Sequence, residues 1–242
     1  MPGDAYEFYP CMVDGEHASI YVNLKYEHGA EPGADTVYWL DIRMADAGPY
    51  GIGTADEGEE LSAFEEAAIA SVGAVGLVYV GRLRTRGVWE TTFYGPADHI
   101  DAVRAAAHEL VGHVVEVRSE KDADWSYYRE LLLPDAERKQ WMDDRRLVQI
   151  LKEQGDALTP PRRVDHFAYF SDPSARDAFI DVVRRNGFEA ELEDSDTEHG
   201  VNVHRADSIE LEHIHEVVMT LVDAAEEHGG RYDGWKTSIE RH

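Results

Sequence analysis

The sequence predicts an α+β protein made of two ferredoxin-like domains, each with the element order βαββαβ and an antiparallel sheet. Apolar residues recur at strand and helix spacings in that same order in both halves of the chain. Pro160 and Pro161 lie between the halves, where paired prolines favour an extended linker. We therefore expect a first domain over residues 1–155, ending in a connecting helix, and a second domain over residues 160–242.

The first domain is expected to contain strands from Ile20 to Tyr26 and from Val37 to Met44. A helix, a strand hairpin, a second helix and a closing strand should follow. No repeat of residues links the two halves, so only their topology is predicted to be shared. The later elements are marked by Leu61, Phe64 and Ala68, by residues 77–83 and 89–94, by Ile100, Val103, Ala107, Leu110 and Val111, and by residues 114–118.

The connecting helix is expected to open at Pro134 and to stop by Gly155. It should pack on the first domain and lead to the second. Its apolar residues near helical spacing are Trp141, Leu147, Val148 and Leu151.

The second domain opens with a short aromatic strand from Phe167 to Phe170. Asp172 is suited to cap a helix whose first residue is Pro173. A hairpin follows, then a helix that begins with a capping box of Asp207 and Glu210, then a final strand. The first helix stops at Gly187, the hairpin spans residues 188–193 and 201–204, the second helix carries Leu211, Ile214, Val218, Leu221, Val222 and Ala225, and the final strand lies within residues 232–239.

The chain is strongly acidic, with 23 basic and 49 acidic residues, a formal net charge of −26 and a sequence pI near 4.7. Such a surface repels phosphates, so we expect no direct contact with nucleic acid or an anionic membrane and favour a cationic partner. The alternative is that the charge only keeps the protein soluble or adapts it to a salty cytoplasm.

Cys11 is the only cysteine, which excludes an intramolecular disulfide and a site built from several thiolates of one chain. The N-terminal residues show neither a signal peptide nor an apolar run of transmembrane length. We therefore expect a cytoplasmic protein.

Three segments of the second domain together resemble the regulator of ribonuclease E activity B family over residues 165–240: Asp165-His166-Phe167-Ala168-Tyr169-Phe170, Gly187-Phe188-Glu189, and residues 229–237 with their Gly-Gly-x-Tyr-Asp-Gly-Trp run. The resemblance implies a ferredoxin-like fold and a non-catalytic protein that binds ribonuclease E and restrains its cleavage of RNA. The first domain is similar to an uncharacterised family found fused to this module, judged by Tyr38-Trp39-Leu40-Asp41 and Phe93-Tyr94-Gly95. That similarity implies no known activity.

A partner-binding surface is predicted on the hairpin of the second domain. Residues 160–242 contain 9 basic and 19 acidic residues, a net charge of −10. An acidic face can occupy an Arg-rich segment that a ribonuclease scaffold otherwise uses to hold RNA. The alternative is a solvated strand face without a partner. The candidate residues are Glu189, Glu191, Glu193, Asp194 and Asp196.

The terminal motif allows two interpretations. Tyr232, Asp233 and Trp235 stand beside the acidic residues and would suit an interface as partner-binding anchors. Alternatively, Gly234 serves a β-bulge and Trp235 covers the sheet from within the protein.

No constellation in the sequence predicts an enzyme, a metal site or a cofactor. His213 and His215 lie two apart on a helix, and His199 and His204 five apart on a strand, so neither pair converges. The glycine-rich residues 48–54 lack a phosphate-binding pattern, and nothing beside Cys11 activates a thiol. Two other functions stay open: a ligand-binding or enzymatic module with its pocket between the sheets or among aromatic strands of the first domain, and a structural homodimer.

Overall fold

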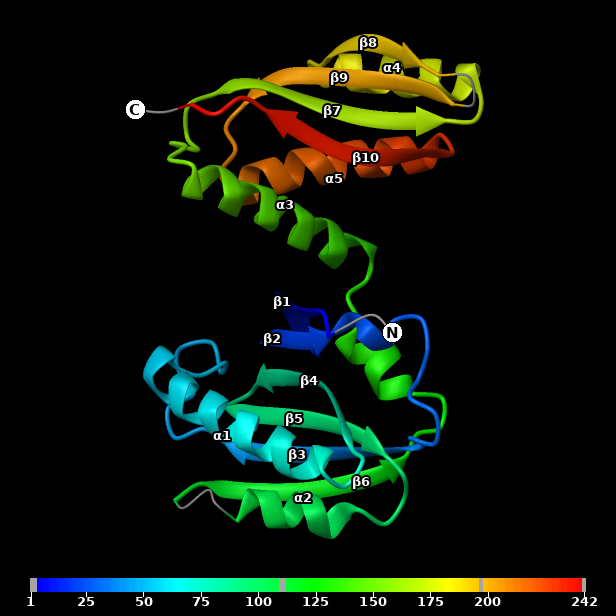
Figure 1. Ribbon diagram of the computed structural model, residues 1–242. Coiled ribbons are helices and arrows are strands. Elements are labelled where there is room, and N and C mark those ends of the chain that lie inside the picture. The colour runs from blue at the N-terminus through cyan, green and yellow to red at the C-terminus, as the bar shows by residue number, and fades with distance from the viewer. Residues whose placement is uncertain (1–3, 109–111, 196–197, 241–242) are drawn as a thin grey trace. The chain divides into compact units, whose positions relative to one another are not determined.

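The computed structural model describes residues 4–108, 112–195 and 198–240. The chain divides into two compact units, Met1–Asp135 and Ala136–His242. Each unit has one antiparallel sheet with helices packed on one face (Figure 1). This confirms the predicted class of two ferredoxin-like α+β domains.

The sheet of unit 1 has the strand order β1-β2-β4-β5-β3-β6. Its last four strands and two helices follow the predicted βαββαβ order, and the β1–β2 hairpin extends the sheet beyond β4. The elements are β1 (Tyr6–Val13), β2 (Glu16–Asn23), β3 (Thr36–Arg43), α1 (Ala55–Gly73), β4 (Val78–Thr85), β5 (Val88–Gly95), α2 (Ile100–Ala107) and β6 (Val114–Lys121).

Two details of unit 1 differ from the sequence prediction. The strand expected to end at Tyr26 ends at Asn23, whose side chain accepts a hydrogen bond from the Lys25 amide and starts a 3-10 turn, η1 (Leu24–Tyr26). Strand β1 was not expected. Leu110 and Val111, predicted to continue the second helix, lie outside the described residues.

The core of unit 1 lies between α1, α2 and one face of the sheet, and includes Tyr38, Leu40 and Ile42 of β3. The segment after β6 covers part of the opposite face, including a π-helical turn, η2 (Tyr128–Leu132). Trp125 stacks on Tyr94 of β5 with ring centroids 4.1 Å apart. The Tyr128 hydroxyl donates to the Asn23 carbonyl of β2 at 2.7 Å. Both sheet faces of this unit are therefore partly covered.

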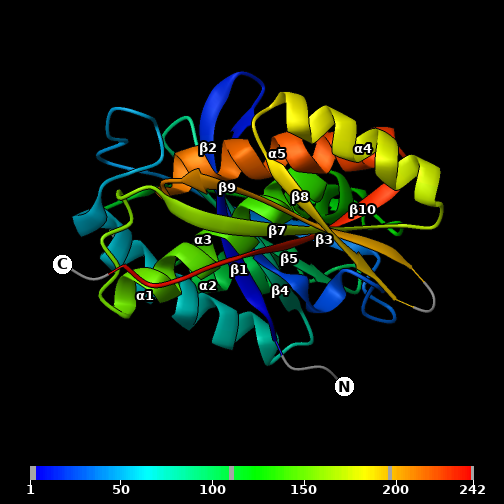
Figure 2. The same ribbon diagram turned by 90° about the horizontal axis from the view of Figure 1, so that it is seen from above.

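Unit 2 repeats the βαββαβ order with the strand order β10-β7-β9-β8. Helices α4 and α5 lie along the same face of its sheet (Figure 2). The prediction that Asp172 caps α4 is confirmed, because its carboxylate accepts from the Ser174 amide at 2.6 Å. The elements are β7 (Arg162–Phe170), α4 (Pro173–Arg185), β8 (Glu189–Asp194), β9 (His199–Asp207), α5 (Leu211–Glu227) and β10 (Gly230–Thr237).

The predicted capping box of α5 is wrong. Glu210 is the N-cap residue, and its side chain makes no capping hydrogen bond. Asp207 instead ends β9, where Arg205 donates to it at 2.9 Å and His213 Nε2 lies 3.1 Å from it. Because β9 extends to Asp207, this residue is not available to cap the helix.

The connecting helix α3 (Ala136–Glu153) belongs to unit 2, not to the first domain as expected. Its residues Val148 and Leu151 pack in one cluster with Val164, Ile214 and Trp235 of unit 2. The helix therefore completes the core beside α5, over β7 and β10. Each helix in the described part of the chain is too short or too polar to cross a membrane.

Candidate functional site

The predicted acidic face lies on β8, the outer strand of the sheet of unit 2. Glu189, Glu191 and Glu193 are paired in register with His204, Asn202 and Gly200 of β9, so all three point to the same sheet face. The intervening Ala190 packs toward the helix-covered core, which makes the glutamate face the open one. All three glutamates are exposed. Asp194 ends the strand, and Asp196 lies outside the described residues.

The three glutamates differ in how strongly they are held. Glu191 accepts from Arg163 at 3.3 Å and lies 3.0 Å from His204 Nε2. The hydrogen bond from Arg163 and the contact with His204 hold the pKa of Glu191 below its ordinary value. Glu189 and Glu193 have no ion-pair partner within the described residues, so their charges are available to another molecule.

The predicted anchors of the terminal motif are separated from this face. Trp235 is 8% exposed, packs among the core residues and donates its indole N–H to Asp144 of α3 at 2.9 Å. The Tyr232 hydroxyl lies 2.8 Å from Nδ1 of the buried His166. Both rings lie on the helix-covered side of β10 and pack within unit 2, as in the alternative interpretation of the terminal motif, and not on the acidic face where partner-binding anchors were predicted. Asp233 is exposed, at the bulge of β10, and pairs with Arg231.

The open face of this sheet also carries two aromatic side chains that the sequence prediction did not assign there. Phe167 and Tyr169 of β7 are half-buried. The Lys236 ammonium lies 4.6 Å from the Phe167 ring centroid, and the Arg231 guanidinium 5.1 Å from that of Tyr169. The alternation of the strand was the signal that could have placed them on this face.

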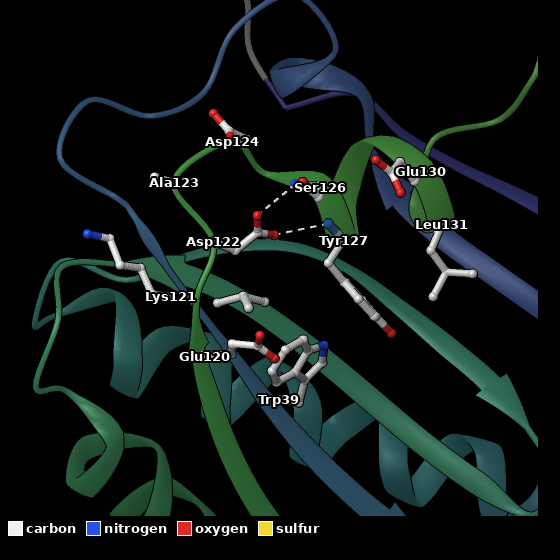
Figure 3. A pocket seen from close by; sticks show the side chains of 11 residues that line it. Trp39, Glu120, Lys121, Asp122, Ala123, Asp124, Ser126, Tyr127, Glu130 and Leu131 are labelled. Atoms are coloured by element: carbon white, nitrogen blue, oxygen red, sulfur yellow. Dashed lines mark hydrogen bonds between the residues drawn. The ribbon is translucent and has the colours of Figure 1, made fainter.

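Unit 1 contains a pocket of about 510 Å³ beside the β3 and β6 edge of its sheet (Figure 3). Trp39 of β3 and Tyr127 form its aromatic walls, and the loop that follows β6 forms the rest. Aromatic strands of the first domain were one of the places where the sequence allowed a pocket. The further lining residues are Val37, Glu120, Lys121, Asp122, Ala123, Asp124, Ser126, Glu130 and Leu131.

Asp122 fixes the loop of this pocket. Its carboxylate accepts hydrogen bonds from the Ser126 amide at 2.8 Å, the Tyr127 amide at 3.0 Å and the Tyr94 hydroxyl at 2.5 Å. Burial opposes ionisation of Asp122, but these hydrogen bonds outweigh it and lower its pKa. The carboxylate therefore acts as a cap that positions Tyr127 over the sheet.

A partly buried cluster of charged side chains lies next to this pocket on the same sheet face. Asp41 and Glu90 stand directly opposite each other on β3 and β5, and Arg118 of β6 bridges them. Arg118 Nε lies 2.8 Å from Asp41 Oδ2, and its guanidinium lies 4.0 Å from the Trp39 ring centroid. The Tyr127 hydroxyl donates to Glu90. One cation thus serves two carboxylates that face each other.

Burial raises the pKa of Glu90 to about 7, and the nearby Asp41 carboxylate adds to the shift. Burial also raises the pKa of Asp41. Two further buried atoms, Asp41 Oδ1 and Trp39 Nε1, have no hydrogen-bond partner within the described residues. Perturbed carboxylates and unsatisfied polar atoms beside a pocket mark a candidate functional site.

The histidines that were weighed as metal ligands make separate contacts. His213 lies beside Asp207, and His215 Nδ1 lies 2.9 Å from Asp144 of α3. His204 faces Glu191. In the part of the chain that the structure describes, no group of three or more His, Cys, Asp or Glu side chains is arranged to hold a metal ion.

Comparison with known families matches both units of the chain. Residues 4–133 match the Family of unknown function (DUF695), and residues 141–237 match the family Regulator of ribonuclease activity B. These matches confirm the two-part resemblance read from the sequence. The second match begins within α3, in agreement with the packing of that helix in unit 2. No curated protein matches the chain.

Two solved structures align with the chain over most of its length but at low similarity. A candidate glycine cleavage system transcriptional repressor is 8% identical, with 84% of this chain and 98% of that chain covered and a TM-score of 0.27. An unknown protein from Galdieria sulphuraria is 12% identical, with 85% and 99% covered and a TM-score of 0.25. These TM-scores are too low to indicate a shared fold.

Proposed function

This chain belongs to the family of unknown function DUF695, and because its second unit matches the Regulator of ribonuclease activity B family, we propose that it regulates a ribonuclease by binding it. The regulated enzyme is an endoribonuclease of the ribonuclease E type, and the effect is inhibition without catalysis by this chain. The observation that carries the proposal is the row of three exposed glutamates on the outer strand β8.

The proposed mechanism is electrostatic competition with RNA. Arg-rich segments of ribonuclease scaffolds hold RNA through its phosphates, and neutralising those arginines removes the attraction. Among the described residues Glu189 and Glu193 have no ion-pair partner, so their carboxylates can pair with such arginines, while Glu191 is already shared with Arg163 and His204. Charge complementarity of this kind speeds association and makes binding depend on salt.

The position of the glutamates on an outer strand suits an extended partner. Within the described residues β8 pairs with β9 alone, so the backbone groups on its other side are available to a further strand. An added strand would place alternate side chains on the glutamate face, where Arg or Lys fits, and the others beside Leu192, which is 59% exposed. The proposed partner segment therefore alternates basic and apolar residues.

The test is a binding titration between the full chain and the Arg-rich scaffold segment of a ribonuclease E-type enzyme at low and high salt. Reversal of Glu189, Glu191 and Glu193 to Lys should weaken binding at low salt by roughly tenfold or more, since like charges then face each other. Asp181, Asp223 and Glu226, exposed on α4 and α5, provide a matched control when reversed to Lys. Binding that survives the first triple variant would contradict the mechanism.

A cleavage assay separates binding from regulation. The intact chain should slow cleavage of a single-stranded RNA by the same enzyme. The β8 triple variant should lose this effect, while the control variant with Asp181, Asp223 and Glu226 reversed to Lys should keep it. Inhibition that persists in the β8 variant would move the regulatory surface away from β8.

A further inference from the structure

The pocket of unit 1 combines two aromatic walls with a strongly acidic rim. These walls are the rings of Trp39 and Tyr127, whose centroids lie 5.1 Å apart and whose planes are nearly perpendicular (Figure 3). Four carboxylates line it, from Glu120, Asp122, Asp124 and Glu130, against the single cation of Lys121. The lining is therefore negative overall.

Most of these carboxylates are not used by the fold. Asp122 is engaged as the cap of the loop, but Glu120, Asp124 and Glu130 are exposed and have no ion-pair partner within the described residues. A concave site focuses the field of such charges and raises the local concentration of cations. The aromatic walls add the quadrupole attraction that rings exert on ammonium and guanidinium groups.

The protein already holds one organic cation in this way, immediately next to the pocket. The Arg118 guanidinium lies 4.0 Å from the Trp39 ring centroid while it pairs with Asp41 and Glu90. The same indole is 5% exposed, and its nitrogen has no hydrogen-bond acceptor among the described residues. The indole that binds a guanidinium of its own chain therefore also lines a pocket in which Glu120, Asp124 and Glu130 have no ion-pair partner among the described residues.

We propose that this pocket binds an organic cation, with an alkylammonium or guanidinium head between the Tyr127 ring and the carboxylates of Glu120 and Glu130. The shared chemistry is found in free amines and in the side chains of Lys and Arg. The inference goes beyond the regulation of a ribonuclease, since it concerns the other unit, and either can fail without the other.

The test uses four ligands that share a butyl chain and differ only in the head group: butylammonium, butylguanidinium, butanol and pentanoate. Each is titrated into the full chain at low salt and followed by the backbone amide resonances of residues 120–131. The two cations should give saturable shifts, whereas butanol and pentanoate should give none. Equal shifts from all four ligands, or from none, would overturn the proposal.

Two variants connect the shifts to the pocket. Neutralising Glu120 and Glu130 to Gln should weaken binding of butylguanidinium by roughly three- to tenfold, in line with removing two partly exposed charge pairs. Replacing Tyr127 with Leu should weaken it by roughly two- to fivefold through loss of the ring. Glu59 and Glu66, exposed on α1, give the matched control when changed to Gln. An equal loss in that control would show a general charge effect and overturn the site.

A second pair of ligands identifies the source of the cation. A capped pentapeptide with a central Arg between glycines is compared with butylguanidinium under the same conditions. Tighter binding of the peptide indicates a protein side chain, and tighter binding of the free guanidinium indicates a small molecule. Both results support the cation site. If high salt displaces neither ligand, the electrostatic basis of the site is contradicted.

Discussion

The two units share one strand order but treat the sheet face away from their helices differently. In unit 1 the segment after β6 covers part of that face with Trp125 and Tyr128, and the Glu90 carboxylate is buried there. In unit 2 the corresponding face carries the exposed glutamates of β8 and half-buried rings of β7. The βαββαβ order therefore fixes the helix-covered core, while the other face is free to acquire a function.

The elements that each unit has beyond the βαββαβ order also differ. Unit 1 gains the hairpin of β1 and β2, which lengthens the sheet, whereas unit 2 gains α3, which thickens its helix layer over β7 and β10. The buried titratable groups also differ. Glu90 lies on the second face of unit 1, but His166 lies in unit 2 on the side of its helices. The two units should therefore respond to mutation and to pH in different ways.

The largest expected effect is the loss of Trp235. Its ring fills the space between α3, α5 and β10, so Trp235→Ala should destabilise unit 2 by roughly 3–5 kcal/mol. Urea unfolding followed by amide resonances of each unit should show that the transition of unit 2 moves to a lower urea concentration, whereas the transition of unit 1 stays unchanged. Leu192→Ala, at an exposed site on β8, is the control and should change little. An equal loss in both units would mean that they unfold together.

In unit 1, Glu90 should make a contribution to stability that decreases as the pH rises. Its pKa in the fold, about 7, lies above the ordinary value of 4.5, so the folded unit binds more protons than the unfolded chain between these values. This contribution is fully present below pH 4.5 and is lost as the pH rises to 7, by about 3 kcal/mol. Glu90→Gln should reduce the slope of stability against pH in urea unfolding at several pH values, whereas Glu66→Gln on α1 should leave it unchanged. A stability of unit 1 that rises over the same interval would contradict this assignment.

Unit 2 should show the opposite slope because of His166. Burial lowers its pKa to about 4, below the ordinary 6.5, so the folded unit binds fewer protons than the unfolded chain in this interval. Stability is full above pH 6.5 and is lost as the pH falls to 4, by about 3 kcal/mol.

The variant that isolates this titration removes both polar partners. The double change of His166 and Tyr232 to Phe takes away the histidine without leaving an unpaired hydroxyl, and should flatten the slope of unit 2. Tyr232→Phe alone keeps the histidine and should keep the slope. If the double variant retains the full acid sensitivity, another group of unit 2 is responsible.

The elements predicted from the sequence are those whose apolar spacing is strong. Both βαββαβ orders and the Asp172 cap follow from periodicity and local chemistry. Strand β1 was missed because Pro10 interrupts it, and proline is tolerated there only because the strand lies at the edge of the sheet. An edge position is not visible in a single sequence.

The candidate sites were less predictable, for two physical reasons. Asp41, Glu90 and Arg118 come from three strands and meet only through the strand register. Acidic residues are also so common in this chain that a single Asp or Glu does not indicate a site. The β8 glutamates alternate in sequence, so their shared face was predictable. Tyr232 and Trp235 lie three apart, which places residues of a regular strand on opposite faces; the bulge at Asp233 brings both to the helix side.

The smallest expected effect concerns that bulge and compares it with its counterpart in unit 1. Gly234 has φ near +119°, a conformation that side chains rarely adopt, but a Cβ there would meet no atom within 4 Å. Gly234→Ala should therefore cost about 1–2 kcal/mol through backbone strain alone. Gly81 follows the bulge of β4, where a Cβ would lie 2.7 Å from the Tyr21 carbonyl oxygen, so its replacement by Ala should cost more. Urea unfolding of the two variants checks this order. A larger loss at Gly234 than at Gly81 would show that the bulge of unit 2, and with it the inward turn of Trp235, tolerates less change than the open space around Gly234 suggests.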